Sequence, residues 1–174
     1  MMPEQIQDAI SVAGTRRQRL LLVVGQPRSG KTAMLQEIAV SHGTSVINVN
    51  LRLSESLLDL TAKQRAVRVN RILSALADET PGELLLFDNI ELLFGVELHL
   101  DPLALLQGLS RNRTLIASWT GEHVGTRLTY AEPSHSEFRH YDDPDAVVVP
   151  ATRPARAAVQ NAIPEALGET EDSQ

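Results

Sequence analysis

The segment that most constrains the fold of this chain is residues 25–32, which read Gly-Gln-Pro-Arg-Ser-Gly-Lys-Thr. They match the Walker A pattern Gly-x-x-x-x-Gly-Lys-Thr, a loop that cradles phosphates. The apolar run of residues 20–24 precedes the loop and predicts a strand buried on both faces, and residues 31–42 carry apolar side chains at helical spacing. A strand, a glycine loop and a helix in this order disfavour the alternative of a glycine-rich turn with a chance lysine. We therefore predict a phosphate-binding loop in an α/β fold.

Each position in the loop has an expected physical role. Gly25 turns the chain at the end of the strand, and Gly30 lets the backbone approach phosphate without a side-chain clash. Backbone N–H groups of the loop should point inward, with the positive N-terminus of the next helix behind them. Lys31 would contact the β- and γ-phosphates, and the Thr32 hydroxyl would be a Mg²⁺ ligand. The predicted nucleotide-binding residues are Gly25, Arg28, Ser29, Gly30, Lys31, Thr32 and Ala33.

A triphosphate site needs a second element, an acid that holds the magnesium shell. Asp88 follows the apolar run of residues 84–87 in the Walker B arrangement, so we predict that Asp88 is a metal ligand together with Thr32. Lys31 and Asp88 are also predicted to be catalytic residues. Without the loop, an aspartate that caps a turn would be the simpler interpretation. Many P-loop ATPases place a glutamate directly after this aspartate, but this chain has Asn89, which cannot take a proton from water. Glu91 is the nearest acid, and it is either the base that activates water or a solvated loop acid.

The order of the predicted strands indicates the branch of P-loop proteins. One predicted strand, residues 45–49, lies between the Walker A and Walker B strands in the chain. That order suits the AAA+-like branch, called ASCE, in which a further strand also lies between them in the sheet. Here the further strand is residues 114–119, and a polar residue at its tip would sense the γ-phosphate. Ser118 and Thr120 are the candidates for this catalytic role, although ordinary strand-end polarity would look the same.

The remaining elements complete a mostly parallel, five-stranded sheet flanked by helices. The expected strands are residues 20–24, 45–49, 84–87, 114–119 and 146–149, and the expected helices are residues 6–13, 31–42, two within 54–79 and one that starts at Asp101-Pro102. Strands that alternate with helices predict parallel pairing with helices on both faces. Thr61 and Gln64 have the spacing of a capping box. Residues 120–145 are polar and turn-rich, so no element is expected there.

The P-loop domain is expected to span residues 1–150, with no helical lid domain. From Pro150 onward the composition shifts to alanine, proline and acidic residues, so residues 151–174 are predicted to be a disordered tail with a transient helix over 161–167. A net charge of -6 and an aromatic content of 3% disfavour a generic nucleic-acid binder. The absence of cysteine excludes disulfides and thiolate metal sites. No apolar run approaches the length of about 20 residues that spans a bilayer, so a cytoplasmic protein is expected.

Two groups of arginines leave alternatives open. An oligomeric ATPase of this branch uses an arginine of one subunit in the site of its neighbour, and such a finger strongly affects the rate. The candidates are Arg111, Arg113, Arg127 and Arg139, each of which is otherwise a surface residue. Lys63 is followed by Arg65, Arg68 and Arg71, which lie along roughly one helix face. That face would meet an acidic partner, DNA phosphates or a neighbour's nucleotide, or it is simply solvated.

Three further segments, beside the loop and its preceding strand, carry a resemblance to a known family. They are Leu-Phe-Asp-Asn-Ile-Glu-Leu-Leu-Phe at 86–94, Asp-Pro-Leu-Ala-Leu-Leu-Gln-Gly-Leu-Ser-Arg-Asn-Arg-Thr at 101–114 and Arg-Leu-Thr-Tyr-Ala-Glu-Pro at 127–133. Together they resemble BrxF, the small P-loop protein of type 3 BREX systems, which defend bacteria against phage. The resemblance covers roughly residues 5–149. By matching position, Lys31, Thr32 and Asp88 carry over, and Asn89 looks typical of the family.

The resemblance implies a role in phage defence beside a large ATPase, an alkaline-phosphatase-like protein, a DNA methyltransferase and a helicase, with DNA reached through the complex. Three functions are compatible with the residues: a slow Mg²⁺-dependent ATPase, a nucleotide-sensing adaptor with little turnover, and a structural subunit. The intact loop and Asp88 argue against the third, and Asn89 separates the first two. The guanine-specifying Asn/Thr-Lys-x-Asp motif is absent, which favours ATP. We also expect a homo-oligomer or nucleotide-dependent assembly, because an incomplete site benefits from a neighbour's arginine.

Overall fold

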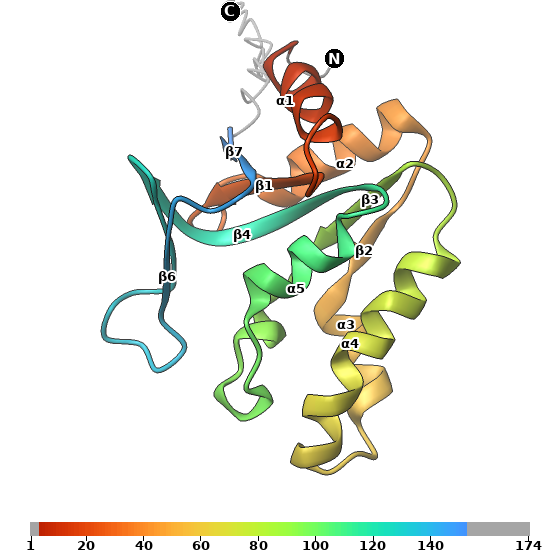
Figure 1. Ribbon diagram of the computed structural model, residues 1–174, viewed down its shortest axis with the longest axis vertical. Coiled ribbons are helices and arrows are strands. Elements are labelled where there is room, and N and C mark those ends of the chain that lie inside the picture. Colours follow the sequence, from red (N-terminus) through yellow and green to blue (C-terminus); the bar gives the residue numbers. More distant parts are fainter. Residues whose placement is uncertain (1–3, 153–174) are drawn as a thin grey trace, which may run out of the picture.

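The computed structural model describes residues 4–152, which form one sheet with helices on both of its faces (Figure 1). Five parallel strands lie in the order β2-β3-β4-β1-β7. Their bounds are Leu20–Gly25 for β1, Val46–Asn48 for β2, Leu84–Asp88 for β3, Thr114–Val124 for β4 and Val147–Pro150 for β7. β4 thus lies between β1, which leads into the glycine loop, and β3, which ends at Asp88. The predicted parallel sheet, with its intervening strand, is confirmed.

Helices cover both faces of the sheet, which is why its central strands are apolar on both sides. Their bounds are Glu4–Gly14 for α1, Lys31–His42 for α2, Val49–Leu57 for α3, Ala62–Glu79 for α4 and Pro102–Leu109 for α5. α1 and α2 lie on one face, and α3, α4 and α5 lie on the other (Figure 1). Leu21 and Val23 of β1 pack toward the first face, and Leu20 and Leu22 pack toward the second. Two clusters of buried side chains therefore pack against β1 and β4, one on each face, and β1 leads directly into the loop.

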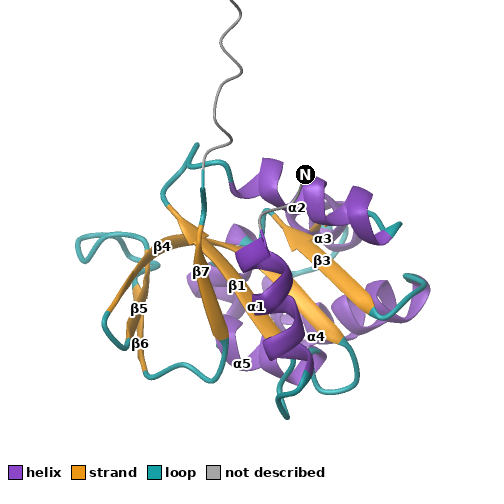
Figure 2. Ribbon diagram, turned by 90° about the horizontal axis from the view of Figure 1, so that it is seen from above, coloured by secondary structure: helices purple, strands orange, loops and turns teal. Residues whose placement is uncertain are grey.

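β4 runs beyond the parallel sheet into an antiparallel hairpin, which was not expected from the polar segment 120–145 (Figure 2). Its last residues pair with β5 (Arg127–Tyr130), which pairs with β6 (Arg139–Asp142). β5 and β6 have 4 residues each, and together they bury two side chains, both in β5. Such short, largely polar segments carry no clear strand pattern in the sequence. A Cβ atom at Gly121 would collide with the carbonyl oxygen of Thr129. The hairpin therefore closes this tightly because position 121 is glycine.

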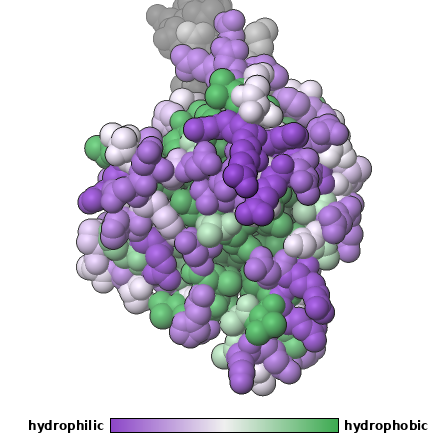
Figure 3. Space-filling model, viewed as in Figure 1, coloured by the Kyte–Doolittle hydropathy of each residue, from purple (hydrophilic) through white to green (hydrophobic). Residues whose placement is uncertain are grey.

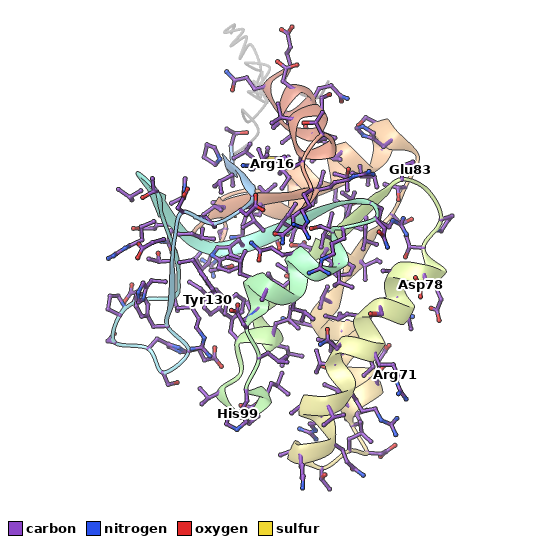
Figure 4. All side chains as sticks on the ribbon, viewed as in Figure 1. Arg16, Arg71, Asp78, Glu83, His99 and Tyr130 are labelled. Carbon is purple, nitrogen blue, oxygen red and sulfur yellow. The ribbon has the colours of Figure 1, made fainter. Side chains whose placement is uncertain are left out.

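An aromatic cluster ties the hairpin to the segment that follows β3. That segment begins with two short 3-10 helices, η1 (Glu91–Phe94) and η2 (Val96–Leu98). The ring of Phe94 stacks on Tyr130 with a centroid distance of 3.4 Å and meets Trp119 edge-on at 5.1 Å. Trp119 Nε1 also donates a 2.8 Å hydrogen bond to the carbonyl oxygen of Thr129. Figure 4 labels Tyr130 beside the hairpin, and the contact of its ring with Phe94 joins the hairpin to η1.

The start of α3 differs from the expected boundary. The strand expected over residues 45–49 ends at Asn48, and α3 begins at Val49 instead of after residue 54. The side chain of Asn48 accepts a 3.0 Å hydrogen bond from the N–H of Leu51 and so caps the helix. Val49, which the apolar pattern placed in the predicted strand, is therefore the first residue of α3, because the Asn48 cap starts the helix there.

Two predicted helix starts are confirmed. Thr61 and Gln64 form both hydrogen bonds of a capping box at the start of α4. Asp101 caps α5 by accepting a 3.1 Å hydrogen bond from the N–H of Ala104, with proline in the first turn. The predicted tail lies outside the described residues from position 153 onward, and the helix expected over 161–167 lies there too.

The basic residues predicted along one helix face, Lys63, Arg65, Arg68 and Arg71, lie on α4, and one of them takes part in packing. Arg65 Nε donates hydrogen bonds to the carbonyl oxygens of Leu57 at 3.1 Å and Leu60 at 3.0 Å, and so joins α4 to the end of α3. Arg68 and Arg71 are exposed, and Arg71 lies on the side of α4 that faces away from the sheet (Figure 4). Between α4 and α5 the surface is partly hydrophobic (Figure 3). A groove of about 410 Å³ lies there, and Leu105 is one of the residues that line it. In the part of the chain that the structure describes, no helix is long and apolar enough to cross a membrane.

Candidate nucleotide-binding site

The glycine loop between β1 and α2 turns tightly into the start of the helix. Gly30 lies at the N-terminus of α2 with φ 99°, and Arg28 has φ 64°, so both adopt left-handed conformations. At Gly25, a Cβ atom would collide with the side chain of Ser29, which explains glycine at the end of β1. The loop therefore presents its backbone beside the N-terminus of α2, an arrangement that binds anions.

Lys31 is buried against this loop. Its Nζ donates 2.8 Å hydrogen bonds to the carbonyl oxygens of Gly25 and Gln26. Burial lowers the pKa of Lys31, and the nearby carboxylates of Glu91 and Asp88 oppose that shift. An ammonium group has three donors, so one further donor remains for a phosphate oxygen.

Thr32 and Asp88 meet across the site. Thr32 Oγ1, in the first turn of α2, donates a 2.7 Å hydrogen bond to Oδ2 of Asp88, which is buried at the end of β3. A hydroxyl and a carboxylate fit Mg²⁺, which takes few protein ligands and completes its shell with water and phosphate oxygens. Residues 4–152 hold no cluster of three or more His, Cys, Asp or Glu side chains that could bind a metal.

The chain turns directly after Asp88, and this turn brings Glu91 to the site. Asn89 has φ 51°, a left-handed conformation that asparagine adopts more readily than most residues. Asn50 Nδ2 donates a 3.0 Å hydrogen bond to Oε2 of Glu91, and Thr120 Oγ1 donates a 3.1 Å hydrogen bond to Oε1. Both carboxylate oxygens are thus oriented, so Glu91 is held in place instead of moving freely in solvent.

Asn50 is a site residue that the sequence analysis missed. Its Oδ1 accepts a 2.9 Å hydrogen bond from the N–H of Leu92, and its own N–H donates to the carbonyl oxygen of Asn89 at 2.8 Å. It therefore joins the first turn of α3 to both ends of the turn that carries Glu91. No signal in the sequence marks this role, because an asparagine after a strand looks like an ordinary helix cap, which Asn48 provides here.

Lys31, Thr32, Asp88 and Glu91 line one pocket of about 470 Å³, and Asn50 lies behind Glu91 outside its wall. Its wall is formed by Pro27, Arg28, Gly30, Lys31, Thr32, Asp88, Asn89, Glu91 and Thr120. The predicted residues Gly25, Ser29 and Ala33 belong to the loop and α2 but do not form this wall. Ser118 does not reach it either, because its side chain is buried within β4. Of the two candidates for the γ-phosphate sensor, only Thr120 lines the pocket, because β4 continues past residue 119.

Three of the four predicted finger arginines already have partners. Arg113 Nη1 donates hydrogen bonds to the carbonyl oxygens of Ala77 at 2.7 Å and Thr80 at 2.8 Å, at the end of α4. Arg127 forms a 2.9 Å ion pair with Asp142 across the hairpin, and Arg139 donates to the carbonyl oxygen of its neighbour Phe138. Arg111 is exposed. Among the residues described, none of the four lines the pocket of its own chain.

The strand order, the loop and the pocket define the class of protein. The chain has the core of a P-loop NTPase of the AAA+-like branch, a nucleotide-binding fold, and the assignment rests on the chain's own topology. No family model matches the sequence, and no curated protein matches it. Among solved structures, the chain is similar to one described as the crystal structure of a DNA replication initiation factor, with 16% identity and a TM-score of 0.47. The similarity covers 86% of this chain but only 44% of the other, so this chain spans less than half of that one's length.

Proposed function

We propose that this protein binds ATP with Mg²⁺ and hydrolyses it slowly. The observation that carries the proposal is the convergence of four charged or polar side chains on one pocket. Lys31 and Thr32 come from the start of α2, Asp88 from the end of β3 and Glu91 from η1. Burying charged groups costs stability unless they are paired, so a subunit that had ceased to use its site would not be expected to keep them together. Bound magnesium would neutralise part of the phosphate charge.

The geometry around Glu91 supports slow turnover. A carboxylate that activates water must itself be oriented, and Asn50 and Thr120 hold its two oxygens. Glu91 stands three positions after Asp88, whereas many P-loop ATPases carry their glutamate directly after the aspartate, and this departure favours a slow rate. The second candidate function is a nucleotide-sensing adaptor with little hydrolysis. Asn89 favours the adaptor, because no acid directly follows Asp88.

The resemblance to BrxF supports a place for this protein in a BREX-type complex that defends bacteria against phage. In this proposal its partners are the large ATPase and the phosphatase-like subunit of the system, and it reaches DNA through the complex in the cytoplasm. Arg68 and Arg71 on α4 are exposed basic groups for an acidic partner surface. Co-purification of tagged wild-type protein with these two subunits tests this setting.

Binding of ATP with Mg²⁺, measured by calorimetry, tests the central proposal. Lys31→Ala is expected to abolish binding, because it removes the cation that faces the phosphates. Lys63→Ala is the matched control, since Lys63 is an exposed lysine on α4. Phosphate release then separates the two functions: slow release that rises with partners supports the ATPase, and secure binding without release supports the adaptor. Absence of ATP binding by the wild type contradicts both.

Assembly of this chain with itself is also part of the proposal. A neighbour's arginine would have to come from an exposed position, and Arg111 satisfies this condition while Arg113 is held by α4. Light scattering with and without a non-hydrolysable ATP analogue measures the mass of the particle. A mass that rises with the analogue, and does so less in Arg111→Ala, supports assembly. An unchanged monomer mass contradicts it.

A further inference from the structure

The glycine loop carries an arginine where its backbone conformation favours glycine. Arg28 has φ 64°, a left-handed conformation in which the Cβ atom of an L-residue crowds the next carbonyl. Glycine adopts this conformation without that cost. A strained residue in a binding loop points to a role for its side chain, because the surrounding structure must hold it there.

The guanidinium of Arg28 is available for a ligand. Arg28 is exposed, and it lines the same pocket as Lys31, Thr32 and Glu91. Within residues 4–152, no hydrogen bond or ion pair joins its side chain to another residue. Arg113, by contrast, is fixed by two carbonyl oxygens at the end of α4.

Apart from Arg28, the pocket has more acidic than basic groups around the expected γ-phosphate, so a second cation beside Lys31 would stabilise that phosphate. Lys31 already gives two hydrogen bonds to loop carbonyls, and it faces the carboxylates of Asp88 and Glu91. A γ-phosphate brought to this end of the pocket adds negative charge beside those two acids. The guanidinium of arginine offers five donors in a planar fork that matches phosphate oxygens better than an ammonium does.

We propose that the Arg28 side chain contacts the γ-phosphate of ATP in its own site and so makes the protein prefer ATP over ADP. The proposal rests on the ATP binding proposed above and extends it to a choice between nucleotides. It also places one phosphate-neutralising arginine within the chain itself, so this contact needs no neighbouring subunit.

Dissociation constants of ATP and ADP, both with Mg²⁺, test this assignment. Arg28→Gly is the main variant, because glycine relieves the left-handed backbone and should leave the melting temperature equal or higher. Its ATP dissociation constant is expected to rise at least about tenfold, or about 1.4 kcal/mol, while that of ADP changes less than about twofold. Arg28→Lys should keep part of the preference. Arg17→Gln is the control, since Arg17 is exposed before β1, at the opposite end of that strand from the loop.

An equal loss of ATP and ADP affinity in Arg28→Gly, or unchanged ATP affinity, overturns this assignment and leaves ATP binding itself standing. If Arg28→Gly melts at a lower temperature than the wild type, Arg28→Asn replaces it in the test, because asparagine also tolerates the left-handed conformation. The change in its ATP dissociation constant is then compared with the change in its ADP dissociation constant in the same way. A wild type that binds neither nucleotide overturns both this proposal and the one on which it rests.

Discussion

Thr32 Oγ1 donates a 2.7 Å hydrogen bond to Asp88 Oδ2, although 56 positions separate the two residues in the chain. The contact arises because α2 begins where β1 ends, and β3 ends at the same edge of the parallel sheet. Functional groups of parallel α/β sheets gather at this carboxyl edge. The hydrogen bond therefore marks the place between loop and sheet where a metal would meet the phosphates.

Removing the Thr32 hydroxyl should weaken only the magnesium-dependent part of ATP binding. In Thr32→Val the side-chain shape is kept but the ligand oxygen is lost, so we expect ATP affinity with Mg²⁺ to fall about tenfold, the effect of about 1.4 kcal/mol. Affinity in the presence of a chelator should match that of the wild type. Thr32→Ser keeps the hydroxyl and should bind normally. A similar loss with and without Mg²⁺ would show that Thr32 acts on the loop instead of the metal.

Replacing Glu91 with glutamine should spare ATP binding and remove turnover. The amide keeps the size of the side chain but cannot accept a proton from water. Phosphate release under single-turnover conditions, beside a binding titration, measures both properties. Glu97→Gln is the matched control, because Glu97 is an exposed glutamate on η2. Normal hydrolysis by Glu91→Gln would mean that this carboxylate is not the base.

Thr120, and not Ser118, should affect turnover. Thr120→Val removes the hydroxyl that holds Oε1 of Glu91, so we expect kcat to fall about tenfold, a loss of about 1.4 kcal/mol in transition-state stabilisation, with a smaller change in KM. Thr120→Ser keeps the hydrogen bond and should retain most activity. Ser118→Ala should leave both constants unchanged, because Ser118 is buried away from the pocket. An effect of Ser118→Ala larger than that of Thr120→Val would favour Ser118 of the two candidates.

The loop and Asp88 could be predicted from sequence because each belongs to a continuous pattern. An apolar strand followed by Gly25 or by Asp88 fixes where the side chains lie at the sheet edge. Asn50 and Thr120 could not be predicted in their roles, because both act through contacts with Glu91 across a distance of many residues. The same limit explains the missed hairpin. Its strands are stabilised by cross-strand rings and by the close approach at Gly121, and the alternation in β5 covers only 4 residues, too few to indicate a strand.

Gly121→Ala should destabilise the protein, whereas Gly108→Ala should not. A Cβ at position 121 meets the carbonyl oxygen of Thr129, so the hairpin must shift, and crowding of this kind costs about 1–3 kcal/mol. Gly108 lies in α5 with nothing near its missing Cβ, so alanine there should stabilise by about 0.5–1 kcal/mol. Denaturant unfolding measures both. Equal stability of the two variants would contradict the tight closure of the hairpin.

The protein should lose stability at alkaline pH through Tyr130. Burial, with the charge of Glu91, raises the pKa of Tyr130 to about 12, and burial also raises the pKa of Tyr141. In the unfolded chain a tyrosine ionises near pH 10, about its usual value. Because the folded state favours the neutral phenol, this contribution to stability is fully present below about pH 10 and is lost as the pH rises toward 12.

Tyr130→Phe removes the ionisable group and keeps the ring that stacks on Phe94. Its free energy of unfolding should therefore decline less steeply than that of the wild type above about pH 10. Tyr141→Phe should flatten the decline too, but it also loses a 3.1 Å hydrogen bond from the Tyr141 hydroxyl to Asp101 and so should be less stable at neutral pH. Ultraviolet titration of the folded protein gives an independent measurement, and full phenolate formation at pH 10 would contradict the burial of these rings. An unchanged slope in Tyr130→Phe would show that other groups control alkaline unfolding.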